Sequence, residues 1–444
     1  MPGLQISRRE FESEVALRIA QVHAFQIFDS RGNPTVQADV VLEGGIRGRG
    51  LVPAGASRGS REALELRDGN SSRFRGRSVQ RAVRHVNDEI AKAVHGMDSG
   101  DQASIDRVLV ELDGTANKAR LGANAILAVS MAAADATANA RGKMLFETLT
   151  EGTGSLLPLP EIQIFGGGAH ADHRTDVQDF LLVAVGARTY LESLEIIFNV
   201  YNTARDVLKE RNRLFGIADE GGYWPEFSTN EEILQLLVEV IRRAGYEFGR
   251  DVAISLDIAA SDLFDQHTGV YRFAREHREF SSKQFAELML GWCEKYPIIS
   301  LEDPMSESDW DGWARLRSEL GDKIQLVGDD LFCTNQELIK RGIEAGIANA
   351  VLIKPNQIGT VTETLAAIRL TQQAGWLPII SARSGETEDA FISHLAVATD
   401  AGQLKVGSFS RGERMVKWNE VIRIQQTLGE RARFLGGSIF RGLH

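Results

Sequence analysis

Short apolar runs that end on a polar residue recur through the second half of this chain. The runs are rich in Val, Ile and Leu, which is typical of buried strands. After a first separation of 45 residues, from 257 to 302, the polar ends of successive runs are 22 to 29 residues apart. Roughly 25 residues is the length of one strand plus one helix, so the pattern predicts a parallel β/α barrel. The polar residues at or just beyond the ends of the runs are Asp257, Glu302, Asp329, Lys354, Arg383 and Lys405.

The N-terminal part has a different pattern. Val36, Val40 and Leu42 alternate with polar residues and precede Gly44-Gly45, which predicts a hairpin. Helical periodicity follows over 78–94 and 124–140, and residues 1–18 have the composition of a polar, helical extension. Gly and Pro gather over 152–160. We therefore expect an N-terminal α+β domain over 1–155 and a barrel domain over 156–444.

In a parallel barrel, the C-terminal ends of the strands share one face and carry the chemistry. Three carboxylates, two lysines and one arginine would then converge. The first three, Asp257, Glu302 and Asp329, have no Cys or closely paired His beside them, and carboxylate oxygens suit Mg²⁺ far better than Zn²⁺. Any one of these acids could instead cap a helix or a turn. Their recurrence in consecutive units favours the metal site.

Lys354 and Lys405 end buried strands, where burial beside cations would lower the pKa of a lysine and make it a base near neutral pH. A salt bridge to the nearby carboxylates is the alternative. Arg383 and Ser384 place a guanidinium and a hydroxyl after a strand, which suits a phosphate or carboxylate, although one arginine in a surface loop would look the same.

Two glycine-rich segments offer further polar groups. Glu220 lies in the string ADEGG, which combines an acid with an exposed backbone turn. His170 follows a Gly triplet that permits close approach to a ligand, and a metal role for His170 with His173 is the weaker interpretation.

Composition excludes several classes of function. The 444 residues are 43% hydrophobic and 25% charged, as in an ordinary globular protein, and the net charge of −11 argues against a nucleic-acid partner. The first residues lack the apolar core of a secretory signal. No apolar stretch is long enough to span a bilayer, so we expect no membrane partner. Only Cys293 and Cys333 are present, which favours a reducing compartment and a cytoplasmic location.

Several strings together resemble the enolase family, from about residue 22 to about 435. They are DSRGNPTV, GAS followed by EALELRDG, LDGTANKARLGANAIL, DEGG, SLEDP, DDL, IKPNQIGT, RSGETED and the stretch K-x-G…R-x-E-R at 405–414. The resemblance implies a TIM-like β/α barrel whose second strand runs against the others, behind an N-terminal α+β domain. It also implies a homodimeric Mg²⁺-dependent lyase that dehydrates 2-phosphoglycerate, a small anionic phosphorylated substrate, to phosphoenolpyruvate.

The resemblance also implies a role for each site residue. Asp257, Glu302 and Asp329 would hold one Mg²⁺, and Ser57 in the small-residue loop over 52–60 would help to bind a second. Lys354 would remove the C2 proton, and Glu220 would act as the acid for the departing hydroxyl. Substrate-binding residues would be His170, Gln178, Asp179, Arg383, Ser384 and Lys405.

The chain departs from the family pattern at several positions. Ala382 stands where the family has a histidine, and Asp179 is one methylene shorter than the usual glutamate. Tyr223-Trp224-Pro225 follows DEGG in place of small residues, and the second glycine-rich string reads GGGAHA instead of NGGSHA. Arg58 and Arg61 stand where the loop usually has Thr and His.

These changes cluster around the departing hydroxyl, so we expect a specialised variant. The branch that fits is the carboxyphosphonoenolpyruvate synthase type, which acts in phosphonate antibiotic biosynthesis. A second, nucleotide-activated substrate would then lie beside Arg58 and Arg61 of the small-residue loop. The alternative is an ordinary glycolytic enolase (phosphopyruvate hydratase). A non-catalytic binding protein is disfavoured, because a scaffold needs neither three metal carboxylates nor a buried lysine.

Overall fold

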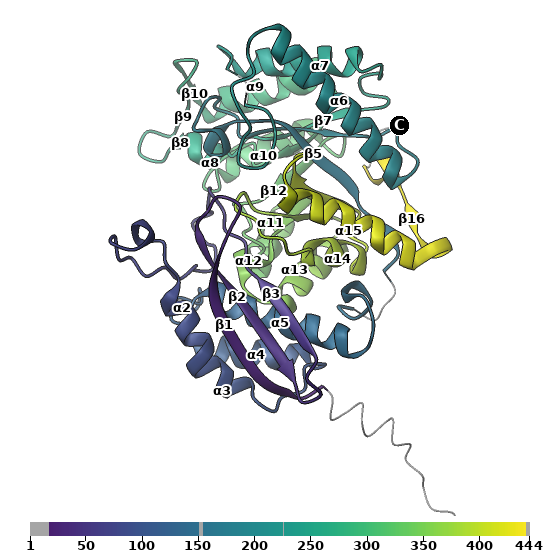
Figure 1. The fold of residues 1–444 in the computed structure, drawn as a ribbon. Coiled ribbons are helices and arrows are strands. Elements are labelled where there is room, and N and C mark those ends of the chain that lie inside the picture. Colours follow the sequence, from purple (N-terminus) through teal and green to yellow (C-terminus); the bar gives the residue numbers. More distant parts are fainter. Residues whose placement is uncertain (1–16, 151–153, 225, 441–444) are drawn as a thin grey trace, which may run out of the picture.

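The computed structural model describes residues 17–150, 154–224 and 226–440 (Figure 1). The extension expected over 1–18 therefore lies almost entirely outside the described residues. The chain first forms an antiparallel sheet of β1 (Ile19–Phe28), β2 (Pro34–Leu42) and β3 (Arg47–Leu51). The hairpin predicted around Gly44-Gly45 is the β2–β3 connection.

Helices cover one face of this sheet. The segment predicted over 78–94 is continuous helix, made of α2 (Gln80–His85), the π-turn η2 (Val86–Ile90) and α3 (Ala91–Val94), and α4 (Gln102–Asp113) follows. The alanine-rich α5 (Ala123–Ala140) lies directly on β2 and β3. Gly48 allows this approach, since a Cβ on it would lie 2.0 Å from the backbone nitrogen of Ala136.

The remainder of the chain builds a closed eight-stranded barrel above this domain (Figure 1). Its strands, in order around the barrel, are β5 (Leu159–Gly166), β6 (Asp179–Val183), β7 (Ala253–Asp257), β11 (Ile298–Glu302), β12 (Gln325–Gly328), β13 (Ala350–Ile353), β14 (Leu377–Ser381) and β15 (Gln403–Gly407). All neighbours pair in parallel except β6, which is antiparallel to both β5 and β7. The fold class expected from the sequence is confirmed.

Helices surround the barrel and connect its strands. They are α6 (Tyr190–Glu210), α7 (Asn230–Arg243), α9 (Ser282–Lys295), α10 (Trp310–Leu320), α11 (Gln336–Ala345), α12 (Pro355–Ile358), α13 (Val361–Gln373), α14 (Phe391–Ala398) and α15 (Gly412–Leu428). Many begin after a side chain that accepts a hydrogen bond from the first turn, which satisfies backbone donors that the helix itself leaves free. Such caps are Thr189, Thr229, Ser281, Asp309, Asn335 and Thr360.

Shorter elements include α8 (Ala260–Leu263), the small sheet of β8 (Phe264–Asp265), β9 (Val270–Phe273) and β10 (Arg278–Ser281), and the pair β4 (Leu156–Leu157) with β16 (Arg433–Phe434). The predicted boundary at 155/156 falls just before β4 and stays a prediction. In the part of the chain that the structure describes, no helix is long and apolar enough to cross a membrane.

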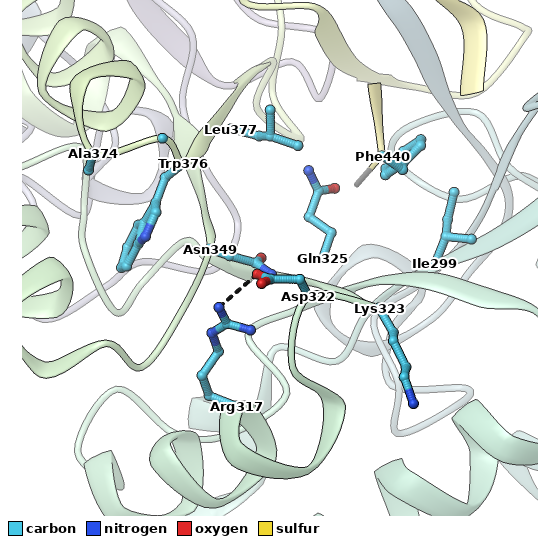
Figure 2. Close-up of a pocket in the computed structure, with 11 residues that line it drawn as sticks. Ile299, Arg317, Asp322, Lys323, Gln325, Asn349, Ala374, Trp376, Leu377 and Phe440 are labelled. Carbon is cyan, nitrogen blue, oxygen red and sulfur yellow. Dashed lines mark hydrogen bonds and ion pairs between the residues drawn. The ribbon is translucent and has the colours of Figure 1, made fainter. Parts of the chain in front are cut away.

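A cavity of about 180 Å³ lies at the N-terminal end of the barrel strands (Figure 2). Gln325 and Leu377, the first residues of β12 and β14, line it together with Trp376 and Phe440. The residues predicted to carry chemistry lie at the other ends of these strands, so this cavity is separate from the candidate site.

Candidate active site

Asp257, Glu302 and Lys405 meet at the C-terminal mouth of the barrel. The Nζ of Lys405 lies 2.9 Å from Oδ2 of Asp257 and 2.6 Å from Oε2 of Glu302. All three side chains are buried, because each lies at or near the end of a barrel strand and points inward. Gln178 donates to Oδ2 of Asp257 at 3.1 Å. The structure therefore brings together one strand-end lysine and two of the predicted metal carboxylates.

Lys354 and Asp329 form a second buried pair. The Nζ of Lys354 lies 2.5 Å from Oδ2 of Asp329, and Gln357 donates to Oδ1 of the same carboxylate at 2.8 Å. Burial acts to lower the pKa of Lys354, but the Asp329 carboxylate outweighs it and raises this pKa. The expectation of a lowered lysine pKa is thus wrong, and the salt-bridge alternative describes both lysines.

The carboxylates fit a divalent cation. Glu302 keeps a buried Oε1 atom without a hydrogen-bond partner, and burial with the neighbouring Asp257 charge raises the pKa of Glu302 well above its usual value. Clustered carboxylates that destabilise one another in this way are relieved by a cation, and an all-oxygen set suits Mg²⁺. Behind Asp329, the Asp303 carboxylate accepts from the backbone nitrogens of Asp329 and Asp330 at 2.9 and 2.8 Å, and so orients that loop.

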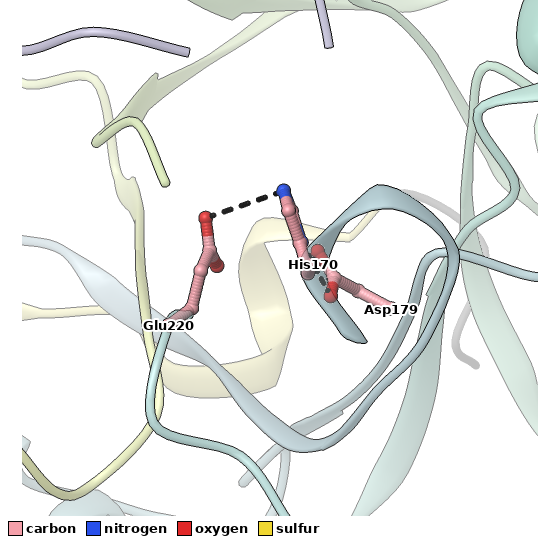
Figure 3. Close-up of side chains that lie close together, drawn as sticks. All are labelled: His170, Asp179 and Glu220. Atoms are coloured by element: carbon pink, nitrogen blue, oxygen red, sulfur yellow. Dashed lines mark hydrogen bonds and ion pairs between the residues drawn. The ribbon is translucent and has the colours of Figure 1, made fainter. Parts of the chain in front are cut away.

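His170 lies between two acidic residues on the opposite wall (Figure 3). Its Nδ1 is 3.0 Å from Oδ1 of Asp179, and its Nε2 is 3.9 Å from Oε1 of Glu220. Asp179 begins the antiparallel strand β6, so its position at the start of that strand brings it to the same mouth as Asp257 at the end of β7. Gln163 of β5 donates to Asp179 and accepts from the backbone of Gly222, which fixes the Glu220 loop.

Burial and mutual charge set the protonation of this group. Burial acts to lower the pKa of His170, but Asp179 and Glu220 outweigh it and raise the pKa to about 9. Burial raises the pKa of Asp179 to about 6, whereas the charges of His170 and Arg414 outweigh burial and lower the pKa of Glu220. The proton of this cluster therefore resides on His170 near neutral pH.

Arg383 and Ser384 follow β14 under the small-residue loop. Arg383 pairs with both Glu62 oxygens at 3.2 Å, and its Nη2 donates to the carbonyl of Ser57 at 3.0 Å. The Ser384 hydroxyl accepts from the backbone nitrogen of Ala56 at 2.7 Å. A buried arginine on α15, Arg414, donates to the carbonyls of Arg383 and Ser384 and holds this turn in place.

Sequence reasoning did not single out Gln163, Gln357 or Glu62, although all three contact the predicted residues. Glu62 lies within the string EALELRDG and could have been found there. Gln357 lies within the string IKPNQIGT and could have been found in the same way, whereas Gln163 carries no local signal, because only the closed barrel brings it to Asp179. Ser57 is placed beside Arg383 through its backbone, and its metal role stays a prediction.

Comparisons with known proteins agree with this architecture. Residues 19–149 match the profile "Enolase, N-terminal domain", and residues 154–442 match "Enolase, C-terminal TIM barrel domain". A curated relative, Enolase 1 of Desulfitobacterium hafniense (strain Y51), is 52% identical over 424 residues, which span 95% of this chain and 97% of that protein.

The expectation of a specialised phosphonate-biosynthesis variant is wrong. A protein named Enolase 1 shares half of the residues over nearly the whole chain, which favours the ordinary alternative, and nothing supports a second, nucleotide-activated substrate. The geometry gives a physical reason. Although its side chain is shorter than the family's glutamate, Asp179 still contacts His170, so this substitution keeps the hydrogen bond between the two side chains.

Two matching domains and one long, close relative decide the family. Members use Mg²⁺ and act on a small phosphorylated substrate, and buried acidic clusters, such as that of Asp303, Asp329 and Asp330, could hold a metal ion. The chain therefore belongs to the enolase family and is a Mg²⁺-dependent lyase.

Proposed function

We propose that this protein is an ordinary enolase that interconverts 2-phosphoglycerate with phosphoenolpyruvate and water. The observation that carries the proposal is the pair of buried lysines, each bonded to carboxylates at one barrel mouth. The opposing cluster of His170, Asp179 and Glu220 supplies a protonated group for the second half of the reaction.

Cationic side chains would hold the substrate. Arg383 and Ser384 would bind its phosphate in place of the contacts that they make with Glu62 and the 54–57 loop. Lys405 binds the carboxylate. Asp257, Glu302 and Asp329 would hold one Mg²⁺, and the loop that carries Ser57 would supply ligands for a second.

Lys354 removes the proton from C2. With Asp329 engaged as a metal ligand, the carboxylate that raises the pKa of Lys354 would be neutralised, and burial would lower this pKa toward the range of a base. The C2 electrons move into the carboxylate, which then carries two negative charges beside Lys405. Mg²⁺ supplies stabilisation of this extra charge when it is bound.

The hydroxyl on C3 leaves in the second step. The carboxylate electrons return to form the C2–C3 double bond, the C3–O bond breaks, and the hydroxyl takes a proton to depart as water. Glu220 delivers this proton, and the ion cluster with His170 stores it. Gln163 bonds both to Asp179 and to the backbone of the Glu220 loop, and so holds the two at a fixed separation.

A direct assay tests the proposal. Purified protein with Mg²⁺ and 2-phosphoglycerate should produce the ultraviolet absorbance of an enolpyruvate, and excess chelator should stop the increase. Absence of product in the presence of Mg²⁺ would refute the proposed function. We further propose that the protein is a homodimer and that it is located in the cytoplasm, as the family resemblance implies. Sedimentation equilibrium would measure the oligomeric state.

A further inference from the structure

The Glu220 carboxylate is not fixed by a hydrogen bond to the histidine that it faces (Figure 3). Its Oε1 lies 3.9 Å from Nε2 of His170, which is beyond hydrogen-bond distance. Proton transfer needs donor and acceptor within hydrogen-bond reach, and a displacement of about 1 Å is costly for a positioned catalytic group. The position of the backbone that carries Glu220 therefore matters for the second half of the reaction.

That backbone is bonded to the barrel on both sides of the Glu220 side chain. The carbonyl of Glu220 accepts from the backbone nitrogen of Ser408, just after β15, at 2.9 Å. The nitrogen of Asp219 donates to the carbonyl of His170 at 3.0 Å. These contacts tie the loop to the two segments that border the site.

The next carbonyl, that of Gly221, accepts hydrogen bonds from two side-chain hydroxyls. The hydroxyl of Tyr201 on α6 donates to it at 2.9 Å, and the hydroxyl of Ser410, between β15 and α15, donates at 2.8 Å. A carbonyl oxygen has two lone pairs, so these two donors satisfy it. Both hydroxyls come from segments far from Gly221 along the chain.

The contact between this loop and Ser410 is close. Gly221 has a φ of +97°, and a Cβ on it would lie 2.7 Å from Oγ of Ser410. A Cβ on Gly407, at the end of β15, would lie 2.8 Å from the carbonyl oxygen of Glu220. Glycine at both positions therefore lets the Glu220 loop pack directly against the β15–α15 connection.

The Tyr201 ring is itself held in place. It stacks on Tyr223, with ring centroids 4.4 Å apart and an angle of 18° between the planes, and both side chains are buried. The backbone of Tyr223 bonds to Ile164 and Gly166 of β5 at 2.8 and 3.0 Å. The Tyr201 hydroxyl is thus a rigid donor, because its ring is packed against a residue that is anchored to the barrel.

We propose that Tyr201 and Ser410 are positioning residues, whose hydroxyls hold the Gly221 carbonyl and thereby place the Glu220 carboxylate for proton delivery to the departing hydroxyl. The role of Glu220 as the acid rests on the proposed function. Neither Tyr201 nor Ser410 touches the reacting atoms in this account. Their effect should therefore appear in the second half of the reaction and not in removal of the C2 proton by Lys354.

Tyr201→Phe removes one oxygen atom and keeps the stacked ring. This variant should lower kcat for dehydration of 2-phosphoglycerate by about 3- to 10-fold and leave KM within about 2-fold of the wild type. Exchange of the C2 proton with deuterated water should stay within about 2-fold, because this step does not need Glu220. A variant that merely loosened the fold would slow both reactions.

A double-mutant cycle with Ser410→Ala tests whether the two hydroxyls act on one carbonyl. Each single variant leaves the Gly221 carbonyl one donor, whereas Tyr201→Phe with Ser410→Ala leaves it none. The loss of kcat in the double variant should therefore exceed the product of the two single losses. An exact product of the single effects would show that the hydroxyls act independently and would overturn the shared role.

Tyr190→Phe is the matched control. Tyr190 is also a buried tyrosine of α6, and its hydroxyl donates to a backbone carbonyl, that of Trp418, at 3.1 Å. The change removes the same atom from the same helix, away from the Glu220 loop. Both dehydration and C2 exchange should stay within about 2-fold of the wild type.

The outcomes separate this proposal from the proposed function. An active wild type with unchanged dehydration in the double variant would overturn the positioning role alone. Equal losses of exchange and dehydration in Tyr201→Phe would do the same, because they would indicate a general structural defect. A wild type that makes no enolpyruvate would refute the proposed function itself, and with it the role given to Glu220.

Discussion

The Nδ1 atom of His170 lies 3.0 Å from Oδ1 of Asp179. The carboxylate belongs to the first residue of β6, and the imidazole belongs to the loop after β5, so the antiparallel strand brings them together. This contact keeps His170 protonated beside Glu220, and a side chain one methylene shorter than the family's glutamate suffices for it.

Removal of the Asp179 charge should slow the second half of the reaction. In Asp179→Asn the side chain keeps its size, but the His170 proton loses its charged partner. Dehydration of 2-phosphoglycerate should fall by about 10²- to 10⁴-fold, the range for one acid–base contact. Ala382→His, which restores the family's residue, is the comparison and should change the rate by less than about 3-fold, since the unmodified site is already complete. An inactive wild type that Ala382→His rescues would contradict this view.

Mg²⁺ should stabilise the protein as well as activate it. The metal would relieve the repulsion around Glu302, so saturation at about 100 times the dissociation constant should add roughly 2.7 kcal/mol to the free energy of unfolding. Thermal melts with and without Mg²⁺ measure the gain. Glu302→Gln should lose most of it together with activity. An equal gain in this variant would place the metal elsewhere.

Lys354 should control exchange of the C2 proton. Lys354→Ala removes the only base proposed for this step, so exchange of the C2 proton of 2-phosphoglycerate with deuterated water should slow by at least about 10²-fold. Proton NMR of the recovered substrate follows the exchange. Lys323→Ala changes an exposed lysine at the other end of the barrel (Figure 2) and should exchange normally. Undiminished exchange in Lys354→Ala would assign the base to another residue.

Glu161 should make stability depend on pH. This β5 carboxyl is fully buried inside the barrel, its Oε1 has no partner, and burial raises its pKa to about 7 from 4.5. The folded state therefore holds the proton more tightly than the unfolded state, and the contribution to stability is lost as pH rises from about 4.5 through about 7. Glu161→Gln should match the wild type near pH 5 and exceed its free energy of unfolding by on the order of 2–3 kcal/mol at pH 8.

Urea unfolding at the two pH values provides the measurement. Glu195→Gln on the surface of α6 is the matched control and should shift neither midpoint appreciably. A constant difference between Glu161→Gln and the wild type at both pH values would mean that the carboxyl does not titrate in this window.

Close packing of α5 on the sheet should make Gly48 intolerant of a side chain. The Cβ of Gly48→Ala would meet the backbone of α5 at 2.0 Å, which cannot relax by rotation of a side chain. We expect a loss of about 1–3 kcal/mol or more in the unfolding of the N-terminal domain. Gly291→Ala in α9, where no atom lies within 4 Å of the added carbon, should be neutral or slightly stabilising in the same melts.

The strand-end chemistry could be predicted from the order of residues along the chain. Asp257, Glu302 and Lys405 follow apolar strands, and parallel strands with intervening helices have one geometric solution, in which their C-terminal ends share a face. Asp179 is the exception, because it precedes its apolar run. Only the reversed direction of β6 brings it to the same mouth, and that direction was expected from family resemblance, not from periodicity.

The pKa of Lys354 shows what the amino-acid order alone does not determine. Its buried position at a strand end was predictable, but the sign of its pKa shift depends on an Asp329 oxygen 2.5 Å away. Electrostatic interactions fall off with distance, so a strand-length pattern can place a residue on a face but does not choose its nearest partner. The sequence by itself therefore determined the barrel, the domain type and the residue kinds at its mouth. Tertiary structure alone decided the ion pairs and the Gln163 support, because each joins segments that are far apart along the chain.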